Sequence, residues 1–340
     1  MTGSVRPGDP ALEVSGLCVS YGGEPVLRGL DLVVGPAEAV AVLGPSGGGK
    51  STLLHTVAGF VQPDAGEVYV HGRVVATASH SEPPEQRDLG MVFQSYALWP
   101  HLTALDTVAY PLRRAGRTRP EARRRALELL DLMGIAALAG RRPAQLSGGE
   151  QQRVGVARAL AREASLYQFD EPTAPLDTAL RATLQEELAS QRSTLGAAVL
   201  YSTHDVAEAF AVADRVALLR DGVVVQVAPP GQIYEEPVDI WAASLTGVAS
   251  ALAVEVADTW LPRPAVGTLP SRATVLVRPE WARLGGPLPG RVVGVRYRGS
   301  DTDYRLETPA GSLQVRERGR PKARVGEAPG ATVDRVWVLR

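Results

Sequence analysis

Several residue types are scarce or absent in this chain of 340 residues. Cys18 is its only cysteine, so neither a disulfide within the chain nor a cysteine-ligated zinc cluster can form. Asparagine is absent, and Lys50 and Lys322 are the only lysines, so arginine carries almost all of the positive charge. A chain that nearly avoids lysine has placed one of its two lysines in a glycine-rich loop.

Long apolar runs and a strong net charge are also lacking. No uncharged apolar stretch of about 18 residues occurs, so no segment is expected to span a bilayer. Met1–Pro10 has no apolar core, unlike a signal peptide. The formal net charge is −1, so no long-range field draws the whole protein toward nucleic acid or anionic lipid. The length predicts about two domains.

The first part of the chain alternates between strand-like and helix-like segments. Strands are expected at Ala11–Ser20, Val26–Val34, Ala39–Leu43, Leu166–Phe169, Val199–Ser202 and Val216–Leu219, and helices at Ser51–Ala58 and Ser147–Glu163. This order predicts an α/β domain with a mostly parallel sheet covered on both faces. Residues 100–145 have apolar positions at helical spacing and predict a helical insertion.

Beyond Gly247 the pattern changes to that of a small all-β domain. Proline and glycine become frequent, and apolar and polar residues alternate at Val292–Tyr297, Tyr304–Thr308 and Ser312–Arg316. The tripeptide Pro309-Ala310-Gly311 predicts a hairpin turn.

A phosphate-binding loop is the strongest motif, because it fits G-x-x-x-x-G-K-[ST] between a strand and a helix. It comprises Gly44, Pro45, Ser46, Gly47, Gly48, Gly49, Lys50, Ser51 and Thr52. Glycines let backbone N–H groups curl around a phosphate, and the following helix N-terminus favours anions. Lys50 is expected to reach the β- and γ-phosphates of a nucleotide, and Ser51 to ligate Mg²⁺.

An acidic pair at the end of another buried strand completes this chemistry. Asp170 is expected to hold Mg²⁺ through water, and Glu171 to orient and deprotonate the attacking water, a role worth about 10²–10⁴ in rate. Pro172 ends the strand where both carboxylates are needed.

A second anion site follows from a Ser-Gly-Gly at a helix start. The segment reads Leu146-Ser147-Gly148-Gly149-Glu150-Gln151-Gln152-Arg153. One active site does not need two phosphate cradles, so the second is expected to serve the nucleotide of a facing subunit. Here the chain resembles the ATP-binding subunits of ABC transporters, whose signature motif is similar.

The resemblance covers nearly the whole chain and implies further site residues. Tyr21 matches the aromatic residue that stacks on adenine, Gln94 the Q-loop glutamine that touches Mg²⁺ or the water, and His204 the switch histidine that contacts the γ-phosphate. Asp177 falls in the D-loop, which acts across the dimer, and Gln151 is implied to contact the partner's ATP together with Ser147, Gly148 and Gly149.

The family implies that residues 11–246 form a P-loop ABC cassette. This cassette would contain an antiparallel β subdomain and a helical subdomain at about residues 95–160. Residues 247–340 resemble the OB-like TOBE domain of importer ATPases, with Val277-Arg278-Pro279-Glu280 as its entry motif. The implied ligands are ATP and Mg²⁺. The implied partners are a second copy of the chain, two membrane permease subunits and, indirectly, an external solute-binding protein. The protein would sit on the cytoplasmic side of the membrane, against the permease subunits.

Two positions depart from the family pattern. Gln168 puts an amide in a strand expected to be apolar, and a buried amide must find partners. Ala174-Pro175 stands where the family commonly has Ser-Ala, so a hydroxyl is missing and φ is fixed at Pro175.

Other functions remain open at this stage. A soluble ATPase of the same superfamily would act on nucleic acid or ribosomes, but such chains carry either two cassettes or a long coiled coil between the phosphate-binding loop and the signature motif. Here about 95 residues separate the two motifs, which is too few for a long coiled coil, and only one cassette is found in the sequence. The seven arginines between Arg113 and Arg125 are interpreted as a solvated helix face rather than a nucleic-acid site. A GTPase would recognise guanine with an Asn-Lys-x-Asp motif, and this chain has no asparagine. A small-molecule kinase would not need the second anion site at Ser147–Gly149.

The transported solute is chosen by other subunits. The stretch Tyr96-Ala97-Leu98-Trp99-Pro100-His101-Leu102-Thr103 resembles iron(III) and polyamine importer ATPases, so iron(III) is the first choice. Polyamine, phosphonate, sulfate, molybdate and sugar importers are the alternatives.

The assignment of Glu171 predicts the behaviour of a Glu171→Gln variant. It should still bind ATP but hydrolyse it about 10²–10⁴-fold more slowly, because an amide cannot take a proton from water. Steady-state phosphate release and nucleotide-binding measurements check this, and hydrolysis at the native rate would contradict the assignment.

Overall fold

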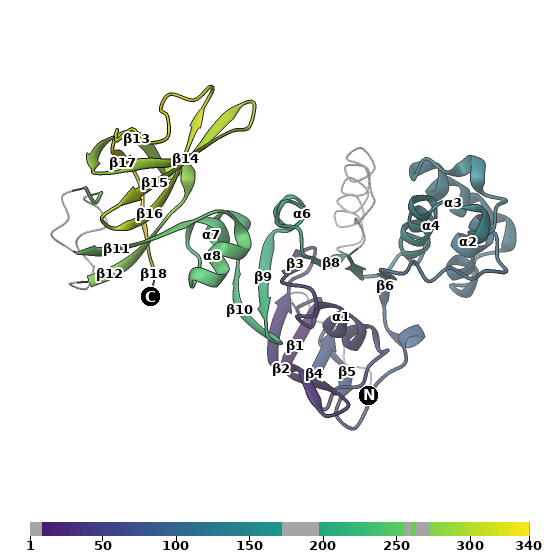
Figure 1. Ribbon diagram of the computed structural model, residues 1–340. Helices are drawn as coiled ribbons and strands as arrows, with labels where there is room; N and C mark the ends of the chain where they lie inside the picture. Colours follow the sequence, from purple (N-terminus) through teal and green to yellow (C-terminus); the bar gives the residue numbers. More distant parts are fainter. Residues whose placement is uncertain (1–8, 172–196, 256–259, 263–271, 340) are drawn as a thin grey trace. The chain divides into compact units, whose positions relative to one another are not determined.

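The structure is a computed structural model that describes residues 9–171, 197–255, 260–262 and 272–339. It divides into two compact units, Met1–Pro230 and Gly231–Arg340 (Figure 1). In the part of the chain that the structure describes, no helix combines the length and apolar character needed to cross a bilayer.

The first unit contains ten strands and five α-helices among its described residues. The strands are β1 (Leu12–Tyr21), β2 (Glu24–Val34), β3 (Ala39–Leu43), β4 (Ala65–Val70), β5 (Arg73–Thr77), β6 (Leu89–Val92), β7 (Leu166–Asp170), β8 (Ala198–Thr203), β9 (Arg215–Arg220) and β10 (Val223–Ala228). The helices are α1 (Lys50–Ala58), α2 (Ala104–Arg114), α3 (Arg119–Leu132), α4 (Gly148–Leu160) and α6 (Val206–Val212).

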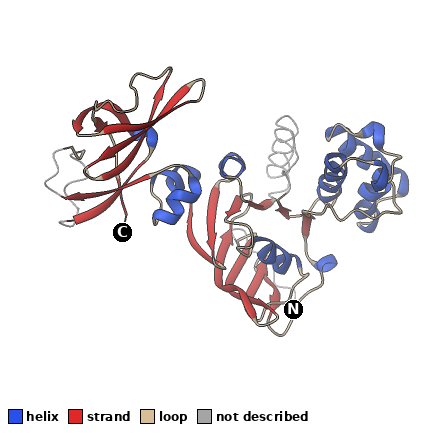
Figure 2. Cartoon of the chain, in the orientation of Figure 1, coloured by secondary structure: helices blue, strands red, loops and turns tan. Residues whose placement is uncertain are grey.

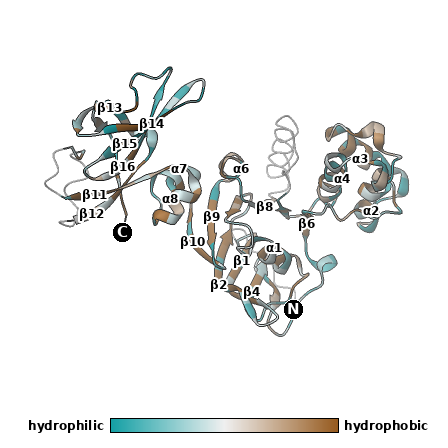
Figure 3. Cartoon of the chain, in the orientation of Figure 1, coloured by the Kyte–Doolittle hydropathy of each residue, from teal (hydrophilic) through white to brown (hydrophobic). Residues whose placement is uncertain are grey.

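A six-stranded sheet forms the centre of this unit, in the order β10-β9-β3-β8-β7-β6. Its pairs are parallel except for β9 with β10. Along β8, Val199 and Tyr201 join one buried cluster, whereas Ala198 and Leu200 join the other. Alternate residues thus enter cores on opposite faces, which confirms the predicted parallel sheet covered on both sides. Figure 3 shows β9 in the hydrophobic colour.

A second sheet in this unit is antiparallel, in the order β2-β1-β4-β5. Gly22 and Gly23 form the turn of its first hairpin at φ 59° and 89°, which only glycine adopts readily. Its buried residues belong to the same cluster as those of α1, so the phosphate-loop helix lies between two sheets. The antiparallel subdomain implied by the family is therefore present.

Helices α2, α3 and α4 form the predicted helical insertion, which Figure 2 shows as the all-helical part of the unit. Each begins at a Ser or Thr: Thr103 accepts a hydrogen bond from the Asp106 N–H, and Thr118 and Ser147 form capping boxes. Helix α4 ends at Leu160, earlier than expected. Glu163 has φ 51°, which a right-handed helix does not accommodate.

The arginines of this insertion make ion pairs along the helix surface. The pairs are Arg117 with Glu163 at 2.6 Å, Arg123 with Asp106 at 2.8 Å, Arg124 with Glu128 at 4.0 Å and Arg125 with Glu128 at 3.4 Å. Such exposed pairs support the interpretation as a solvated, self-compensating face.

A fully buried guanidinium closes the far end of the phosphate-loop helix. Arg87 donates to the carbonyls of Thr56 and Val57, which belong to the last turn of α1, at 2.8 and 2.6 Å. It also donates to the carbonyls of Val75 and Glu82. Burial lowers the pKa of Arg87 to about 10, still far above neutrality, so the group stays charged and satisfies these acceptors.

The second unit is a β domain preceded by two short helices. It contains α7 (Pro230–Glu235), α8 (Ile240–Thr246), β11 (Ser250–Glu255), β12 (Arg272–Val277), β13 (Ala282–Leu288), β14 (Arg291–Tyr297), β15 (Asp301–Thr308), β16 (Gly311–Arg318), β17 (Ala331–Val333) and β18 (Trp337–Leu339). Each strand expected from residue alternation lies within an observed one, and the all-β fold beyond residue 247 is confirmed.

Buried Arg278 explains why α7 and α8 pack with the β domain. Its guanidinium donates to the carbonyls of Tyr234 and Ala243 at 2.7 and 2.9 Å and to the Thr246 hydroxyl at 3.0 Å. The predicted domain boundary lies after residue 246, whereas the compact units meet between Pro230 and Gly231. The limits of the functional domains stay a prediction.

The side chain of Gln168 does not meet the expectation that a buried amide finds partners. Gln168 is 0% exposed in β7, and within the described residues neither its amide nitrogen nor its amide oxygen has a hydrogen-bond partner. Leaving such groups unsatisfied costs about 1–3 kcal/mol.

A Gln168→Met variant should therefore be more stable, by about 1–3 kcal/mol, because a thioether of similar shape carries no amide to desolvate. Chemical denaturation of the first unit measures the change. Gln86→Met is the matched control, since Gln86 is exposed and should shift stability by less than about 0.5 kcal/mol. A Gln168→Met variant less stable than the native chain would refute the account.

Candidate functional site

The carboxyl ends of the parallel strands bring the site together. Register pairs Leu43 of β3 with Thr203 of β8, and Asp170 of β7 with Ser202 of β8. The loop after β3, the acidic end of β7 and the residues after β8 therefore meet at one edge of the sheet, where ligands bind in open α/β folds. Gln94 lies at the same edge, two residues beyond the end of β6.

The glycine loop is shaped by its closest neighbours. A Cβ on Gly44 would lie 2.4 Å from the Leu219 carbonyl oxygen of β9, so only glycine fits. Gly49, the N-cap of α1, has φ 98°, a conformation that L side chains rarely adopt. Between these two residues, Pro45, Ser46 and Gly47 are exposed, so the loop presents its backbone to solvent above the helix N-terminus.

The side chain of Lys50 turns back over the loop. Its Nζ donates to the carbonyl oxygens of Gly44 and Pro45, each at 3.0 Å, and lies 3.3 Å from Glu171 Oε1. Lys50 is 4% exposed, so its charge is compensated by two carbonyl dipoles and one carboxylate. A phosphate in the loop would meet an ammonium group already in place.

Asp170 connects three segments through its carboxylate. Its Oδ1 accepts hydrogen bonds from the hydroxyls of Ser51 at 2.9 Å and Ser202 at 2.8 Å. Its Oδ2 lies 3.7 Å from Nε2 of His55, which is on α1. Asp170 is 2% exposed, and these hydroxyls compensate for its burial.

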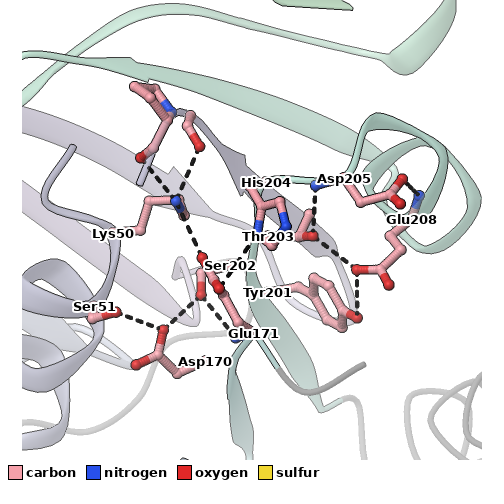
Figure 4. Close-up of polar contacts among 12 residues, drawn as sticks. Lys50, Ser51, Asp170, Glu171, Tyr201, Ser202, Thr203, His204, Asp205 and Glu208 are labelled. Carbon is pink, nitrogen blue, oxygen red and sulfur yellow. Dashed lines mark hydrogen bonds and ion pairs between the residues drawn. The ribbon is translucent and has the colours of Figure 1, made fainter. Parts of the chain in front are cut away.

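Glu171 bridges the lysine and the switch histidine. Its Oε2 lies 3.3 Å from Nδ1 of His204, while its Oε1 faces Lys50 (Figure 4). Its backbone has φ 45°, and its N–H donates to the Ser202 carbonyl and hydroxyl oxygens, both at 3.2 Å. Left-handed φ at a non-glycine residue costs about 1–3 kcal/mol and is typical of functional sites.

Two of the three residues predicted for Mg²⁺, Ser51 and Asp170, fit such an ion. Ser51 and Asp170 offer hard oxygen donors 2.9 Å apart, the type that Mg²⁺ prefers. Among the described residues no group of three or more His, Cys, Asp or Glu could hold a metal.

The Ser-Gly-Gly segment begins α4 as predicted. The N–H of Ser147 donates to Glu150 at 2.7 Å, and the Glu150 N–H donates back to the Ser147 hydroxyl at 3.4 Å. Bonds from the Ser147 backbone and hydroxyl lower the pKa of Glu150. Among the described residues, a Cβ on Gly149 would meet nothing within 4 Å, and one on Gly148 only the Tyr96 hydroxyl at 3.9 Å. These described neighbours leave room for a side chain at both positions.

The positions of the other residues implied by the family do not test their predicted contacts with ATP. Tyr21 ends β1 and is 50% exposed, and Gln94 is also exposed. The amide nitrogen of Gln151 donates to the carbonyls of Pro143 and Leu146 at 3.0 and 3.1 Å. Their contacts with ATP stay predictions. Asp177 and the Ala174-Pro175 departure lie outside the described residues.

Some residues at this edge were not identified from the sequence. The Ser202 hydroxyl contacts both Asp170 and Glu171. Arg158 of α4 donates to the carbonyls of Ala97 and Tyr96 at 2.5 and 3.2 Å, in the loop after Gln94, and desolvation lowers its pKa. The sequence contained an indication for Ser202, because a hydroxyl group in a buried strand needs a hydrogen-bond partner. It contained no such indication for Arg158.

Family models match both parts of the chain. One described as an ABC transporter matches residues 27–174, and one described as a TOBE domain matches residues 275–338.

Curated relatives align over most of their length. Fe(3+) ions import ATP-binding protein FbpC 1 of Rhizobium meliloti is 38% identical over 315 residues, 88% of each chain. Spermidine/putrescine import ATP-binding protein PotA of Legionella pneumophila is 36% identical over 328 residues, 89% of each chain.

Solved structures resemble part of this one. A dimeric post-hydrolysis state of the ATP-binding cassette MJ0796 bound to ADP and Pi matches with a TM-score of 0.59 and 33% identity. The match covers 64% of this chain and 98% of that one.

The contact of Gly44 with β9 generates a prediction. Gly44→Ala should weaken nucleotide binding at least about tenfold, because the new methyl group would displace the loop from the Leu219 carbonyl. Titration with a fluorescent ATP analogue measures this. In Gly140→Ala the added Cβ meets nothing within 4 Å, so affinity should stay native. Native affinity in Gly44→Ala would show that the loop does not depend on this close approach.

Proposed function

The chain belongs to the ABC transporter family of ATP-binding cassettes, and from this premise we propose how its residues hydrolyse ATP to drive an importer. The observation that carries the proposal is the contact of the Glu171 carboxylate with both Lys50 and His204. This contact supports the proposed roles of Glu171 as the base and of Lys50 as the phosphate-binding cation, with the His204 imidazole beside them.

ATP binds with its phosphates in the Gly44–Thr52 loop and its adenine on Tyr21. The backbone N–H groups of the loop and the N-terminus of α1 hold the phosphate oxygens. Lys50 leaves Glu171 for the β- and γ-phosphates, since an ammonium group pairs more strongly with a polyphosphate than with one carboxylate. The exchange frees one oxygen of Glu171.

Glu171 then orients a water molecule for attack on the γ-phosphorus. The water oxygen forms the new bond to phosphorus, the bond to the β–γ bridging oxygen breaks, and the water proton passes to Glu171. His204, which contacts Glu171, is proposed to contact the γ-phosphate. Gln94 is proposed to hold the same water and to link the site to the helical insertion.

Ser51, Asp170 and Gln94 would hold Mg²⁺ together with the phosphates. When bound, the ion supplies positive charge against the charge that develops on the phosphate oxygens. Asp170 is kept in position for this by the Ser202 hydroxyl.

A second copy is proposed to complete each site. Ser147, Gly148 and Gly149 form a helix start of the kind that binds anions, and the described residues leave the space beside both glycines open. That space suits the γ-phosphate held by a facing copy, with Gln151 and Asp177 contributing across the interface. The dimeric structures of a related cassette support this arrangement.

The dimer would sit on the cytoplasmic side of the membrane against two permease subunits, fed by a solute-binding protein. The loop of residues 94–101 is proposed to transmit closure to the permease. Iron(III) is the proposed solute, supported by the relatives named for Fe(3+) import. Polyamine is the alternative, supported by those named for spermidine/putrescine import.

A mixing experiment tests whether sites are shared between copies. Lys50→Ala removes the phosphate lysine, and Gly149→Asp sets a carboxylate against the incoming phosphate in a position with room for it. Each variant alone should be inactive. In an equal mixture, half of the dimers are mixed and each has one intact site, so about one quarter of native activity should return.

ATPase activity returns in the mixture only if each active site is built from residues of two copies. If each copy hydrolysed ATP alone, the mixture would stay as inactive as its components. A mixture of Lys50→Ala with a double variant carrying both changes is the control, because it contains no intact site.

A further inference from the structure

A buried carboxylate lies behind the switch histidine and has no part in the chemistry described so far. Glu208 is only 6% exposed, although it sits in the first turn of the short helix α6. Burying an ionised carboxylate costs several kcal/mol unless donors surround it. Its surroundings therefore indicate what it does.

Hydroxyl groups from β8 point at this carboxylate. Oε2 of Glu208 accepts hydrogen bonds from the Thr203 hydroxyl at 2.8 Å and from the Tyr201 hydroxyl at 3.5 Å (Figure 4). The Thr203 oxygen in turn accepts a bond from the Asp205 N–H at 3.0 Å. The Glu208 N–H donates to the Asp205 side chain at 3.1 Å and closes the ring of contacts.

This arrangement differs from the usual start of a helix. In a capping box, an acidic residue at the third helical position reaches back to the N–H of the capping residue. Here the capping residue is Asp205, and its N–H is taken by Thr203 instead. Glu208 is thereby released from the cap and turns inward to hold Thr203.

The two residues held in this way flank His204. Thr203 is the last residue of β8, and Asp205 caps α6, so both peptide units beside His204 are fixed through one carboxylate. The imidazole itself is 57% exposed and contacts Glu171 at 3.3 Å. Its direction is therefore set by its backbone more than by packing around the ring.

We propose that Thr203 and Glu208 are positioning residues that aim the His204 imidazole at Glu171 and the γ-phosphate. Neither side chain contacts the reacting atoms. The inference rests on the proposed role of His204, and it predicts that both residues act on hydrolysis only through that histidine.

A pair of substitutions at position 203 isolates the hydroxyl. Thr203→Val keeps the shape and removes the donor, so the His204 imidazole should be less well aimed and kcat should fall about tenfold. KM for ATP should stay within about twofold, because the phosphates are held by the loop. Thr203→Ser keeps the hydroxyl and should stay within about twofold of the native kcat.

A double-mutant cycle with His204→Ala distinguishes positioning from a general loss of structure. Once the imidazole is gone, Thr203→Val should change the remaining ATPase rate by less than about twofold. A tenfold drop in that background as well would overturn the inference, as would a native kcat in Thr203→Val alone. The full-length chain with Mg-ATP is used throughout.

The same cycle separates this inference from the proposed function. If His204→Ala alone hydrolyses ATP at the native rate, the proposed role of His204 fails first. If it is slow but Thr203→Val slows it equally further, only the positioning role fails.

A measurement independent of turnover covers a His204→Ala variant that is too slow to assay. The imidazole proton resonance of His204, identified by its disappearance in His204→Ala, should shift in Thr203→Val and stay in place in Thr203→Ser. Glu208→Gln keeps an acceptor oxygen for Thr203 and should resemble Thr203→Ser. An unshifted resonance in Thr203→Val would overturn the inference.

Discussion

One oxygen atom of Asp170 joins the parts of this site that lie far apart in sequence. It accepts the hydroxyls of Ser51, 119 residues away, and Ser202, 32 residues away. Both contacts depend on the register that sets Asp170 opposite Ser202 and Leu43 opposite Thr203. A slip of one residue in any of these strands would turn the side chains to the opposite face. The two sheet cores therefore fix the site as well as the fold.

The same register brings charged and polar side chains together at the carboxyl edge of the sheet. Lys50, Glu171 and His204 come from three different segments, yet each contacts another at 3.3 Å. Lys50 and Glu171 compensate each other's charge, which limits the cost of keeping both poorly hydrated. In the proposed mechanism a polyphosphate replaces Glu171 as the partner of Lys50.

Local features of the sequence predicted much of this. The apolar run Ala39–Leu43 is β3 to the residue, and the glycine loop, Asp170, Glu171 and His204 meet at one edge because parallel strands must end there. Part of what failed depends on contacts between distant segments. The amide of Gln168 has no hydrogen-bond partner among the described residues, which depends on the segments that pack around β7. The link from Thr203 to Glu208 is local, and it arises because Thr203, rather than Glu208, accepts the Asp205 N–H. Packing onto α7 and α8 explains the role of Arg278, which the sequence showed only as part of an entry motif.

The central claim is that an ATP molecule is enclosed between the Gly44–Thr52 loop of one copy and the Ser147–Gly149 helix start of another. A structure of the full-length chain with a non-hydrolysable ATP analogue and Mg²⁺ tests it most directly. We predict two copies, with each γ-phosphate about 3 Å from Ser147 of the facing copy. A single copy with Glu171 and His204 assembled around the γ-phosphate, and with no neighbour's residues 147–149 near it, would contradict the account.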